Sequence, residues 1–423
     1  MRTGNPGSGA LDVWLGDRVV AELTISRRQL AQLRYREDYV TERGEGALGL
    51  TVPLPVSGHR YRGELVDYWI ESLLPEGETR TVLEQYFRVR RGDGFALLTA
   101  IGRDCAGAVA VTSAGEPVTA AASEVKPLTP DEVGQAVAAL RQHPLGVDED
   151  VRVSLGGLQS KLLLVQADGG WARPVGGMPS THILKPDPPE FPGLVASEAF
   201  ALRAAALAGL EAAETRLDTF GGRTVLVVTR FDRSLKDGKL ARLHQEDGCQ
   251  ALGIAPSGPA KYQATEDAAF YRRLAALLAT HARDPADQLR RLGSALTFTV
   301  AIGNTDAHLR NHAFLHQAGT LALSPAYDAA PTVEFTSTHH LALWIGGQSL
   351  LAVVTRRHLL RELAGWGMAP DSAADVIDST LDNLADAYDQ AARLTPEVSS
   401  AIVAACRART ERLRRTASDD AAG

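Results

Sequence analysis

The sequence predicts a two-lobed α+β protein in which a small β-rich subdomain comes first and a mostly helical lobe comes last. Strand-like patterns dominate up to about residue 235, and helical patterns dominate after it. The composition is that of a globular protein, with 45% hydrophobic and 22% charged residues. A chain of 423 residues is long enough for two or three domains, each with its own core.

The first elements define an N-terminal subdomain over residues 11–112. Residues 1–10 show no apolar pattern and are expected to be disordered. The segment LDVWLGDRVVAELT, which opens the subdomain, alternates as a strand, a turn and a strand, and residues 47–55 form another strand-like run. The segments GELVDYWIESLLPEG and TRTVLEQYF are typical of short helices, and Pro75 and Gly77 separate them.

A polar stretch at residues 113–128 contains proline and is expected to be a linker to a lobe over residues 129–235. That lobe opens at Thr129 with Thr-Pro-Asp-Glu, a capping box with proline at the first helical position, which predicts a helix to about Gln142. The segment VRVSLGGLQSKLLLV then predicts a strand, a glycine loop and a strand. Further elements expected in this lobe are strands at 181–187 and 223–233 and a helix at 194–210.

Helical patterns fill the last lobe, residues 236–415, and a frayed tail is expected at residues 416–423. Most of the elements of this lobe are therefore expected to be helices. These helices are expected at about 265–281, 286–302, 357–366, 371–393 and 396–415.

Charge and cysteine content exclude several classes of protein. The formal net charge of -7 argues against direct nucleic-acid binding as the main activity, because phosphate contacts need clustered Lys and Arg. The three cysteines are widely separated, which fits neither a disulfide framework nor a metal-ligand spacing. No secretory leader pattern and no apolar run of about 18 residues is evident, so we expect a cytoplasmic protein without a membrane span.

Lysine is rare in this chain, with six lysines among 44 basic residues. A chain that uses arginine almost everywhere is expected to keep lysine where a compact ammonium group is needed. Lys161 and Lys185 lie beside or within apolar strand-like runs. Lys185 could point into a cleft, neutralise nucleotide phosphates and pair with Glu198 on the following helix, or it could simply be a strand-end lysine in water.

The segment GNTDAHLRNHAFL, which starts at Gly303, is a polar cluster that holds Asp306, His308, Arg310, Asn311 and His312 before the chain turns apolar. Asp306 and Asn311 have the Asp-x-x-x-x-Asn spacing of the protein-kinase catalytic loop. A predicted hairpin follows, and Asp328 comes directly after it. Since Mg²⁺ takes only one or two carboxylates besides phosphate oxygens, Asp328 and Asn311 could bind it and leave Asp306 to act on a nucleophile.

Alternative interpretations of these segments stay open at this point. His308 and His312 are four residues apart and could bind zinc, although no glutamate lies between them and no third ligand is obvious. The same segment could be a solvated turn in which Asp306 caps the chain and His308 packs the loop. The loop SLGGLQS, which starts at Ser154, could offer backbone N–H groups to phosphates or be a plain hairpin.

These segments together resemble the HipA family, the serine/threonine kinase toxins of bacterial toxin–antitoxin modules. The resemblance covers residues 11–370 approximately and depends on several motifs in the correct order. In the N-terminal subdomain they are LLPEGETR and DGFALLTAIGRDCAGAV. In the remainder they are VSLGGLQSKLLL, THILKPD, TRFDR, LHQEDGCQALG, GNTDAHLRNHAFL and LSPAYDAAPT.

The resemblance implies a kinase-like fold that uses ATP and Mg²⁺, with residues 129–235 as the nucleotide-binding lobe and residues 236–415 as the catalytic lobe. Asp306 would be the catalytic base, His308 would contact phosphate from the same loop, and Ser154 would be the site of inhibitory autophosphorylation. Asn311 and Asp328 would be the Mg²⁺ ligands. The ATP-binding positions implied by the resemblance are Ser154, Gly156, Gly157, Lys161, Lys185, Thr229 and Phe231.

The function implied by the resemblance is transfer of the ATP γ-phosphoryl group to a serine of a cellular protein, an aminoacyl-tRNA synthetase in particular. The implied partners are a helix-turn-helix antitoxin of the HipB type and, through it, operator DNA. Two departures are that Thr229 stands where the family often has glutamate, and that the loop SLGGLQSK lacks the alanine and glutamate often found there. The alternatives are a kinase acting on a small molecule and a weakly active corepressor that mainly binds the antitoxin.

Overall fold

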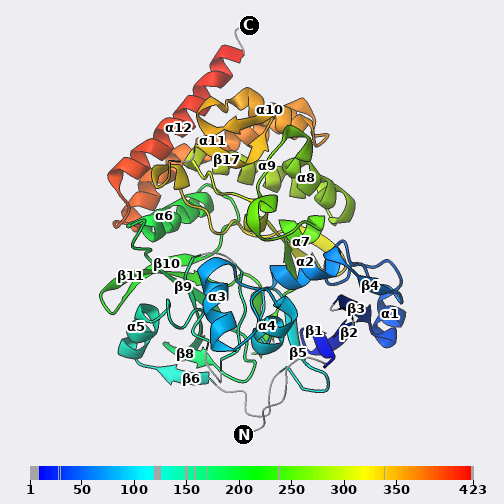
Figure 1. The fold of residues 1–423 in the computed structure, drawn as a ribbon. Helices are drawn as coiled ribbons and strands as arrows, with labels where there is room; N and C mark the ends of the chain where they lie inside the picture. Colours follow the sequence, from blue (N-terminus) through cyan, green and yellow to red (C-terminus); the bar gives the residue numbers. More distant parts are fainter. Residues whose placement is uncertain are drawn as a thin grey trace. The chain divides into compact units, whose positions relative to one another are not determined.

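The computed structural model describes residues 9–26, 28, 30–118, 125–147, 151–156, 159–167, 169–236, 239–337 and 339–420. The chain forms two compact units. Their segments can be followed in Figure 1 by the colours, which run from blue at the N-terminus to red at the C-terminus. The described residues of the first unit lie within Met1–Pro186, Thr219–Arg223 and Asp232–Gly258, and those of the second lie within Asp187–Asp218, Thr224–Phe231 and Pro259–Gly423.

The lobe boundaries expected from the sequence differ from these two units and stay predictions. Strand β6 (Val125–Leu128) lies at the end of the stretch that was expected to be a linker. Of the expected disordered start, residues 1–8 lie outside the described residues. Of the expected frayed tail, residues 421–423 lie outside them, and helix α12 continues to Asp420.

The first unit begins with an antiparallel sheet in the order β4-β3-β2-β1-β5. The hairpin predicted at its start is confirmed, with Leu11 paired to Leu23 across β1 and β2. The strand predicted at 47–55 is wrong, because this segment contains only an isolated bridge, and its prolines cannot donate to a ladder. The strands are β1 (Leu11–Leu15), β2 (Arg18–Ile25), β3 (Ala31–Tyr35), β4 (Arg60–Arg62) and β5 (Val109–Ser113).

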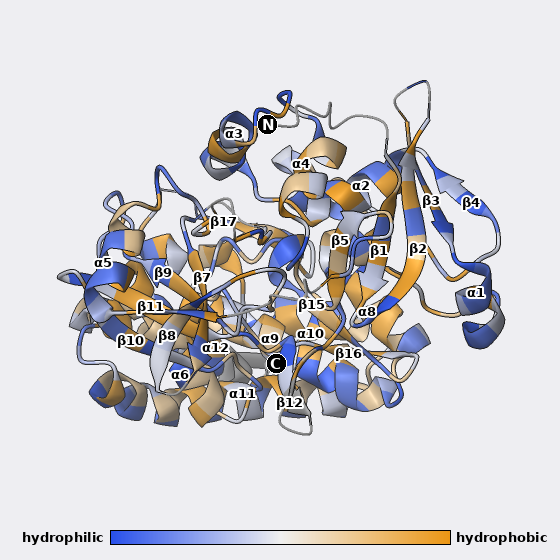
Figure 2. Cartoon of the chain, turned by 90° about the horizontal axis from the view of Figure 1, so that it is seen from below, coloured by the Kyte–Doolittle hydropathy of each residue, from blue (hydrophilic) through white to orange (hydrophobic). Residues whose placement is uncertain are grey.

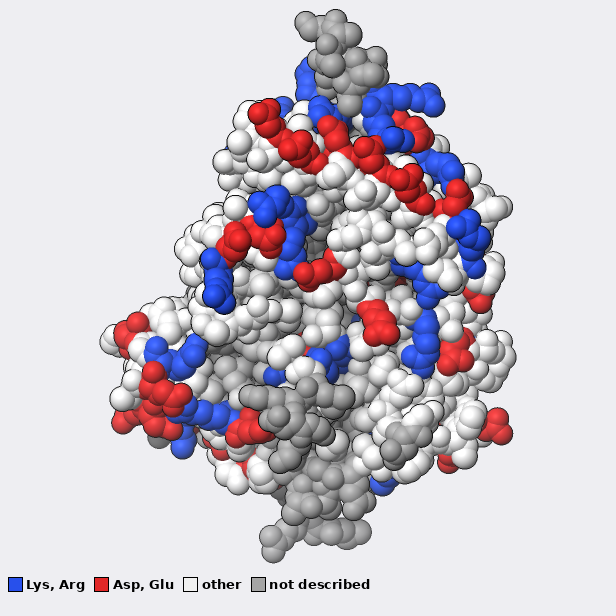
Figure 3. Space-filling view, turned by 180° about the vertical axis from the view of Figure 1, so that it is seen from behind, with Lys and Arg blue, Asp and Glu red and all other residues white. Residues whose placement is uncertain are grey.

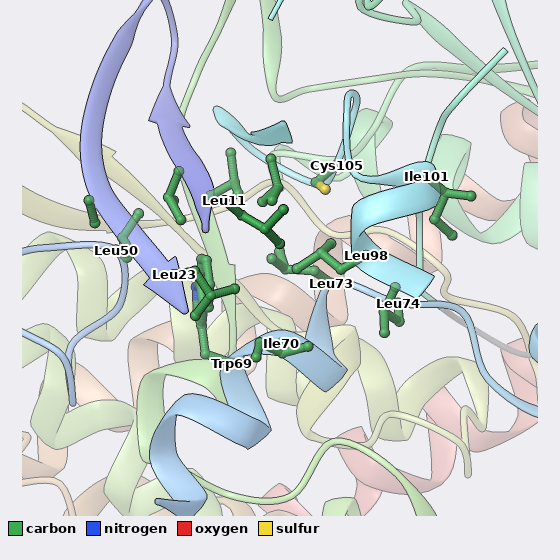
Figure 4. Close-up of a cluster of buried hydrophobic side chains, with 14 of the residues drawn as sticks. Leu11, Leu23, Leu50, Trp69, Ile70, Leu73, Leu74, Leu98, Ile101 and Cys105 are labelled. Atoms are coloured by element: carbon green, nitrogen blue, oxygen red, sulfur yellow. The ribbon is translucent and has the colours of Figure 1, made fainter. Parts of the chain in front are cut away.

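Short helices cover one core of this unit. Trp69 and Ile70 of α2 lie in the same buried apolar cluster as Leu23 of β2 and Leu98 of α4, as Figure 4 shows. Burial of such large side chains contributes about 1.5–3 kcal/mol each. The two predicted helices on either side of Pro75 are confirmed. The helices are α1 (Glu37–Arg43), α2 (Glu64–Ser72), α3 (Gly77–Tyr86) and α4 (Gly94–Ile101).

A second antiparallel set of strands in the first unit runs in the order β9-β7-β8-β6. Its central strand β7 is coloured mainly as hydrophobic in Figure 2, in keeping with its sequence LLLVQA. The capping box at Thr129 is confirmed, although the helix that it starts ends at Ala138. The elements are α5 (Pro130–Ala138), β7 (Leu162–Ala167), β8 (Gly170–Pro174), β9 (His182–Pro186), β12 (Arg233–Lys236), β13 (Lys239–Arg242), β14 (Gln245–Asp247) and α7 (Gly248–Leu252).

Helices dominate the second unit, as predicted. Helices α6 and α9 pack on the long helix α11, and the rings of Phe200 on α6 and Tyr388 on α11 stack 5.8 Å apart. Helix α8 begins at Phe270 instead of 265, because Ala269 has a left-handed backbone conformation just before it. The helices are α6 (Leu194–Leu207), α8 (Phe270–His281), α9 (Pro285–Ile302), α10 (Arg356–Ala364), α11 (Pro370–Leu394) and α12 (Ser400–Asp420).

Strands of the second unit accompany these helices. The hairpin predicted after the polar cluster is confirmed, with β15 and β16 paired in antiparallel register from Phe314↔Leu323 to Gln317↔Thr320. The strands are β11 (Arg223–Thr229), of which Arg223 belongs to the first unit, β15 (Ala313–Gln317), β16 (Thr320–Leu323), β17 (His340–Ile345) and β18 (Gln348–Leu350). Strand β10 (Thr215–Phe220) is shared between the units in the same way.

Acidic and basic side chains form ion pairs between the last helices. Aspartates of α11 pair with arginines from α10 and α12, for example Asp378 with Arg356 at 2.7 Å and Asp382 with Arg414 at 2.8 Å. Figure 3 shows such red and blue side chains side by side near the top of the view. Across the described residues, no helix combines the length and the apolar character that crossing a bilayer requires.

Candidate active site

The polar cluster directly follows helix α9 in the second unit, and Asp306 is the one exposed residue among 303–309. Gly303 ends the helix with a φ of +79°, and a Cβ on it would lie 2.7 Å from Arg409 and 2.8 Å from Val333. Only glycine is therefore accommodated at this helix end. The Asn304 side chain then accepts a hydrogen bond of 3.0 Å from the backbone N–H of Asp306 and so shapes the loop.

Asp306 presents an exposed carboxylate on a loop that is held from several sides. The Tyr262 hydroxyl donates to its Oδ1 at 3.1 Å. Its backbone carbonyl accepts hydrogen bonds from the N–H of His308 at 2.7 Å and from Asn311 Nδ2 at 3.0 Å. Because Asn311 uses its amide nitrogen to hold the loop, its amide oxygen is the atom suited to a hard cation.

Asp328 lies directly beyond the β15–β16 hairpin, as predicted, and its side chain is exposed. It has a left-handed backbone with a φ of +51°, which aspartate tolerates better than most residues and which is common at functional sites. The preceding Tyr327 donates its hydroxyl to the Arg310 carbonyl at 2.7 Å. This bond ties the Asp328 segment to the loop that carries Asp306 and Asn311.

His308 is buried beside these residues and packs edge-on against Tyr262, with ring centroids 5.2 Å apart. Burial and the charge of Lys261 lower the pKa of His308 to about 4, although the Asp328 carboxylate opposes the shift. Its Nδ1 has no hydrogen-bond partner among the described residues. Because its pKa is lowered so far, the imidazole is neutral at neutral pH.

The zinc interpretation gains no support from the described part of the chain, where no three His, Cys, Asp or Glu side chains come together to hold a metal. His312 packs against Tyr271 with ring centroids 5.3 Å apart, and burial lowers its pKa to about 4. One carboxylate and one amide oxygen, by contrast, are donors that suit Mg²⁺, which completes its shell with water and phosphate oxygens. The oxygen atoms of Asp328 and Asn311 fit that chemistry.

The segment expected to meet the adenine also belongs to the second unit. The N–H of Thr229, at the end of β11, donates to the Glu214 carbonyl at 2.9 Å. The ring of Phe231 tilts against Tyr327, with centroids 5.4 Å apart. Phe231 thus contacts the residue next to Asp328.

The remaining predicted site residues belong to the first unit. Ser154 is fully buried, and its hydroxyl donates to the Leu73 carbonyl at 2.5 Å. The buried Lys161 donates to the carbonyl of Gly156 at 2.6 Å and so anchors the glycine loop. Gly157 lies outside the described residues.

The structure decides between two interpretations of Lys185 and corrects the strand expected before the glycine loop. Lys185 is buried on β9, which contradicts the alternative of a strand-end lysine in water. Glu198 is buried on α6, and its pairing with Lys185 stays a prediction. The strand expected before the loop is reduced to one parallel bridge between Asp104 and Val153.

A buried ion cluster supports the glycine loop, and its role was not predicted. Arg233 Nη2 lies 2.7 Å from Asp104 Oδ1, and both side chains are almost completely buried. The hydroxyl of Ser180 donates to the other Asp104 oxygen at 2.7 Å. The carbonyl of Asp104 accepts the N–H of Ser154 at 2.9 Å, so this cluster fixes the residue where the loop begins.

Tyr262 and Tyr327 are two further site residues that sequence reasoning missed. Tyr262 lies 44 residues before the aspartate whose carboxylate it contacts. In the sequence, only its position between two of the quoted motifs pointed to a role at the site. Tyr327 lies within the quoted segment LSPAYDAAPT, but nothing in its spacing indicated that its hydroxyl would hold the loop that carries Asp306 and Asn311.

Two family models match this chain. The HipA N-terminal domain matches residues 11–112, and the HipA-like C-terminal domain matches residues 153–392. A putative kinase Y4mE of Sinorhizobium fredii is 34% identical over 402 residues, which are 91% of this chain and 94% of the relative. The serine/threonine-protein kinase toxin HipA of Shewanella oneidensis is 29% identical over 333 residues, which are 75% of this chain and 74% of that protein.

The fold also matches a solved structure. This is a chain of the Shewanella oneidensis MR-1 toxin–antitoxin complex of HipA, HipB and operator DNA, with a TM-score of 0.80 and 26% identity. The match covers 95% of this chain and 97% of that chain. The α+β, kinase-like fold predicted from the sequence is confirmed by it.

Proposed function

Because this chain belongs to the HipA family of kinase toxins, we propose that it transfers the γ-phosphoryl group of ATP to a serine or threonine hydroxyl of a cellular protein. The observation that carries the proposal is the arrangement in the second unit. Asp306 offers an exposed carboxylate held by Tyr262, and the loops that carry Asn311 and Asp328 are tied together beside it.

Asp306 acts on the acceptor hydroxyl. In the transfer, the hydroxyl oxygen forms a bond to the γ-phosphorus, the bond from that phosphorus to the bridging oxygen breaks, and ADP leaves. The carboxylate of Asp306 accepts the proton of the hydroxyl. The hydrogen bond from the Tyr262 hydroxyl to Oδ1 limits the orientations that this carboxylate can take.

Asp328 and the amide oxygen of Asn311 would hold Mg²⁺, which would neutralise phosphate charge that develops during transfer. We assign the ATP phosphates to Lys185 and to the backbone of the loop that Lys161 anchors. The backbone from Thr229 to Phe231 is assigned to the adenine. Since that contact uses main-chain atoms, threonine in place of the family's glutamate is compatible with it.

Autophosphorylation is proposed at Ser154. Its hydroxyl is buried and donates to the Leu73 carbonyl, so phosphoryl transfer requires the glycine loop to leave this position first. A phosphoserine carries about -1.5 to -2 charges at neutral pH and could not return to a fully buried site without a large desolvation cost. The modified loop would therefore stay open, and ATP binding would be lost.

The partner proposed for this chain is a helix-turn-helix antitoxin of the HipB type, with operator DNA bound through that antitoxin. The proposal is supported by the similar Shewanella protein, whose solved complex contains HipB and operator DNA. The net charge of -7 also favours an indirect contact with DNA. An aminoacyl-tRNA synthetase is the proposed protein substrate.

The test is incubation of the purified chain with γ-labelled ATP, Mg²⁺ and a bacterial lysate, followed by mass spectrometry of labelled proteins. The wild type should label a protein on serine or threonine, and Asp306→Asn should not. Asp386→Asn is the matched control, because Asp386 is an exposed aspartate of helix α11 in the same unit. Label on small molecules alone would favour a small-molecule kinase, and no transfer despite antitoxin binding would favour the corepressor.

A further inference from the structure

A cavity of about 730 Å³ opens beside Asp306 within the second unit. One wall comes from the start of helix α6 and another from strand β17 and the segment before it. Its walls are rich in large apolar side chains. These side chains are Phe191, Leu194, Tyr262, Phe335, Leu341 and Trp344.

The cavity is lined almost entirely by uncharged side chains. Among the described residues that line it, Asp306 is the one Asp, Glu, Lys or Arg side chain. The other polar lining groups are neutral hydroxyls, the amide of Gln263 and the imidazole of His340. A charged group placed in the cavity would therefore lose hydration without gaining an opposite charge, unless it were a cation at Asp306 itself.

The apolar walls are held firmly. The side-chain carbonyl of Gln263 accepts the N–H of Trp344 at 3.1 Å, and the N–H of Gln263 donates to the Ala342 carbonyl at 2.7 Å. Tyr262, the next residue, forms the wall with its ring and holds Asp306 with its hydroxyl. The catalytic carboxylate and the apolar wall are thus fixed by one short segment.

We propose that this cavity is the acceptor site and that it selects serine or threonine residues with an apolar or aromatic neighbour in the substrate protein. The inference rests on the proposed function. A hydroxyl that gives its proton to Asp306 must approach to about 2.6–3.2 Å. Residues next to the acceptor then enter the cavity, where apolar side chains bury area against Phe335 and Trp344 and carboxylates meet the Asp306 charge.

The experiment uses synthetic peptides with one serine, in which each position from two before to two after it is varied among leucine, phenylalanine, lysine and glutamate. The wild type should prefer an apolar residue at one of these positions by about tenfold or more in kcat/KM. Phe335→Ala should reduce that ratio. Thr336→Arg, which adds a cation at an exposed lining position, should raise the rate with glutamate peptides relative to leucine peptides.

Val353→Ala is the matched control, because Val353 is an exposed apolar residue of the same unit that does not line the cavity. It should keep the wild-type preference. Equal rates with charged and apolar peptides, or an unchanged preference in both cavity variants, would overturn the inference. If only whole proteins are labelled, mapped sites with charged neighbours would overturn it and apolar neighbours would support it. Absence of transfer to any peptide or protein would instead overturn the proposed function itself.

Discussion

Replacing Arg233 by methionine should open the base of the glycine loop. The guanidinium, which is almost completely buried, donates to the carbonyls of Ser180, Gly107 and Cys105 at 2.9–3.1 Å and to the Asp104 carboxylate at 2.7 Å. Methionine keeps part of the apolar stem but supplies no donor. Asp104 would then keep a buried charge without its closest cation.

The structure sets the size of this effect. Removal of one partner of a buried ion pair typically costs about 3–5 kcal/mol. Asp104 would still accept two hydrogen bonds from Ser180, and Arg242 Nε would remain 3.6 Å from it. Asp232, a second buried carboxylate 3.0 Å from the same guanidinium, would still accept the N–H of Gly107. Because hydrogen bonds at both carboxylates compensate part of the loss, we expect about 3 kcal/mol.

Hydrogen exchange followed by mass spectrometry measures the loss of local stability at the start of the glycine loop. The N–H of Ser154 donates to the Asp104 carbonyl, so its protection reports on the cluster. A loss of about 3 kcal/mol in the free energy of local opening should accelerate exchange there by about 100-fold. Arg34→Met is the control, since the Arg34–Glu37 pair is exposed and should contribute at most about 1 kcal/mol. Equal exchange of Ser154 in both variants would refute the reasoning.

Three further predictions concern the site residues. Asp328→Ala should remove the effect of Mg²⁺ on ATP binding in calorimetry, and an unchanged Mg²⁺ effect would place the metal elsewhere. Lys161→Met should accelerate hydrogen exchange in the glycine loop, because the bond to the Gly156 carbonyl is lost; unchanged exchange would mean that Lys161 does not anchor the loop. His308 has a pKa lowered to about 4 from 6.5, so it stabilises the native state above pH 6.5 and this contribution is lost as the pH falls toward 4. His308→Gln should therefore reduce the fall in melting temperature between pH 7 and 4.5, and an equal fall in both proteins would contradict the shift.

The sequence was most informative where local spacing decides the structure. Asp306 and Asn311 are five residues apart, and the structure connects them by a hydrogen bond that closes the loop. Asp328 could be placed near Asp306 because a hairpin brings the chain back toward the residues that precede it. Alternating apolar residues predict such a hairpin well. The roles of these residues in phosphoryl transfer stay predictions.

The walls of the cavity beside Asp306 could not be predicted, because they come from separate parts of the chain. Phe191, Tyr262 and Trp344 are each about 70 or more residues apart, and no periodicity connects them. The absent strand before the glycine loop has a similar cause. Its partner at Asp104 is about 50 residues away and offers only one bridge, whereas an apolar run alone predicts a full strand.

The chain passes from the first unit to the second and back, so the first unit is not one continuous segment of the sequence. The first unit is completed only by Thr219–Arg223 and Asp232–Gly258, which come after part of the second unit has been made. A fragment that ends at Pro186 would therefore lack Arg233 and leave Asp104 without its cation. During synthesis the N-terminal portion cannot complete its fold until residues up to Gly258 have been made. A split protein cut after Pro186 would therefore separate segments that belong to the same unit.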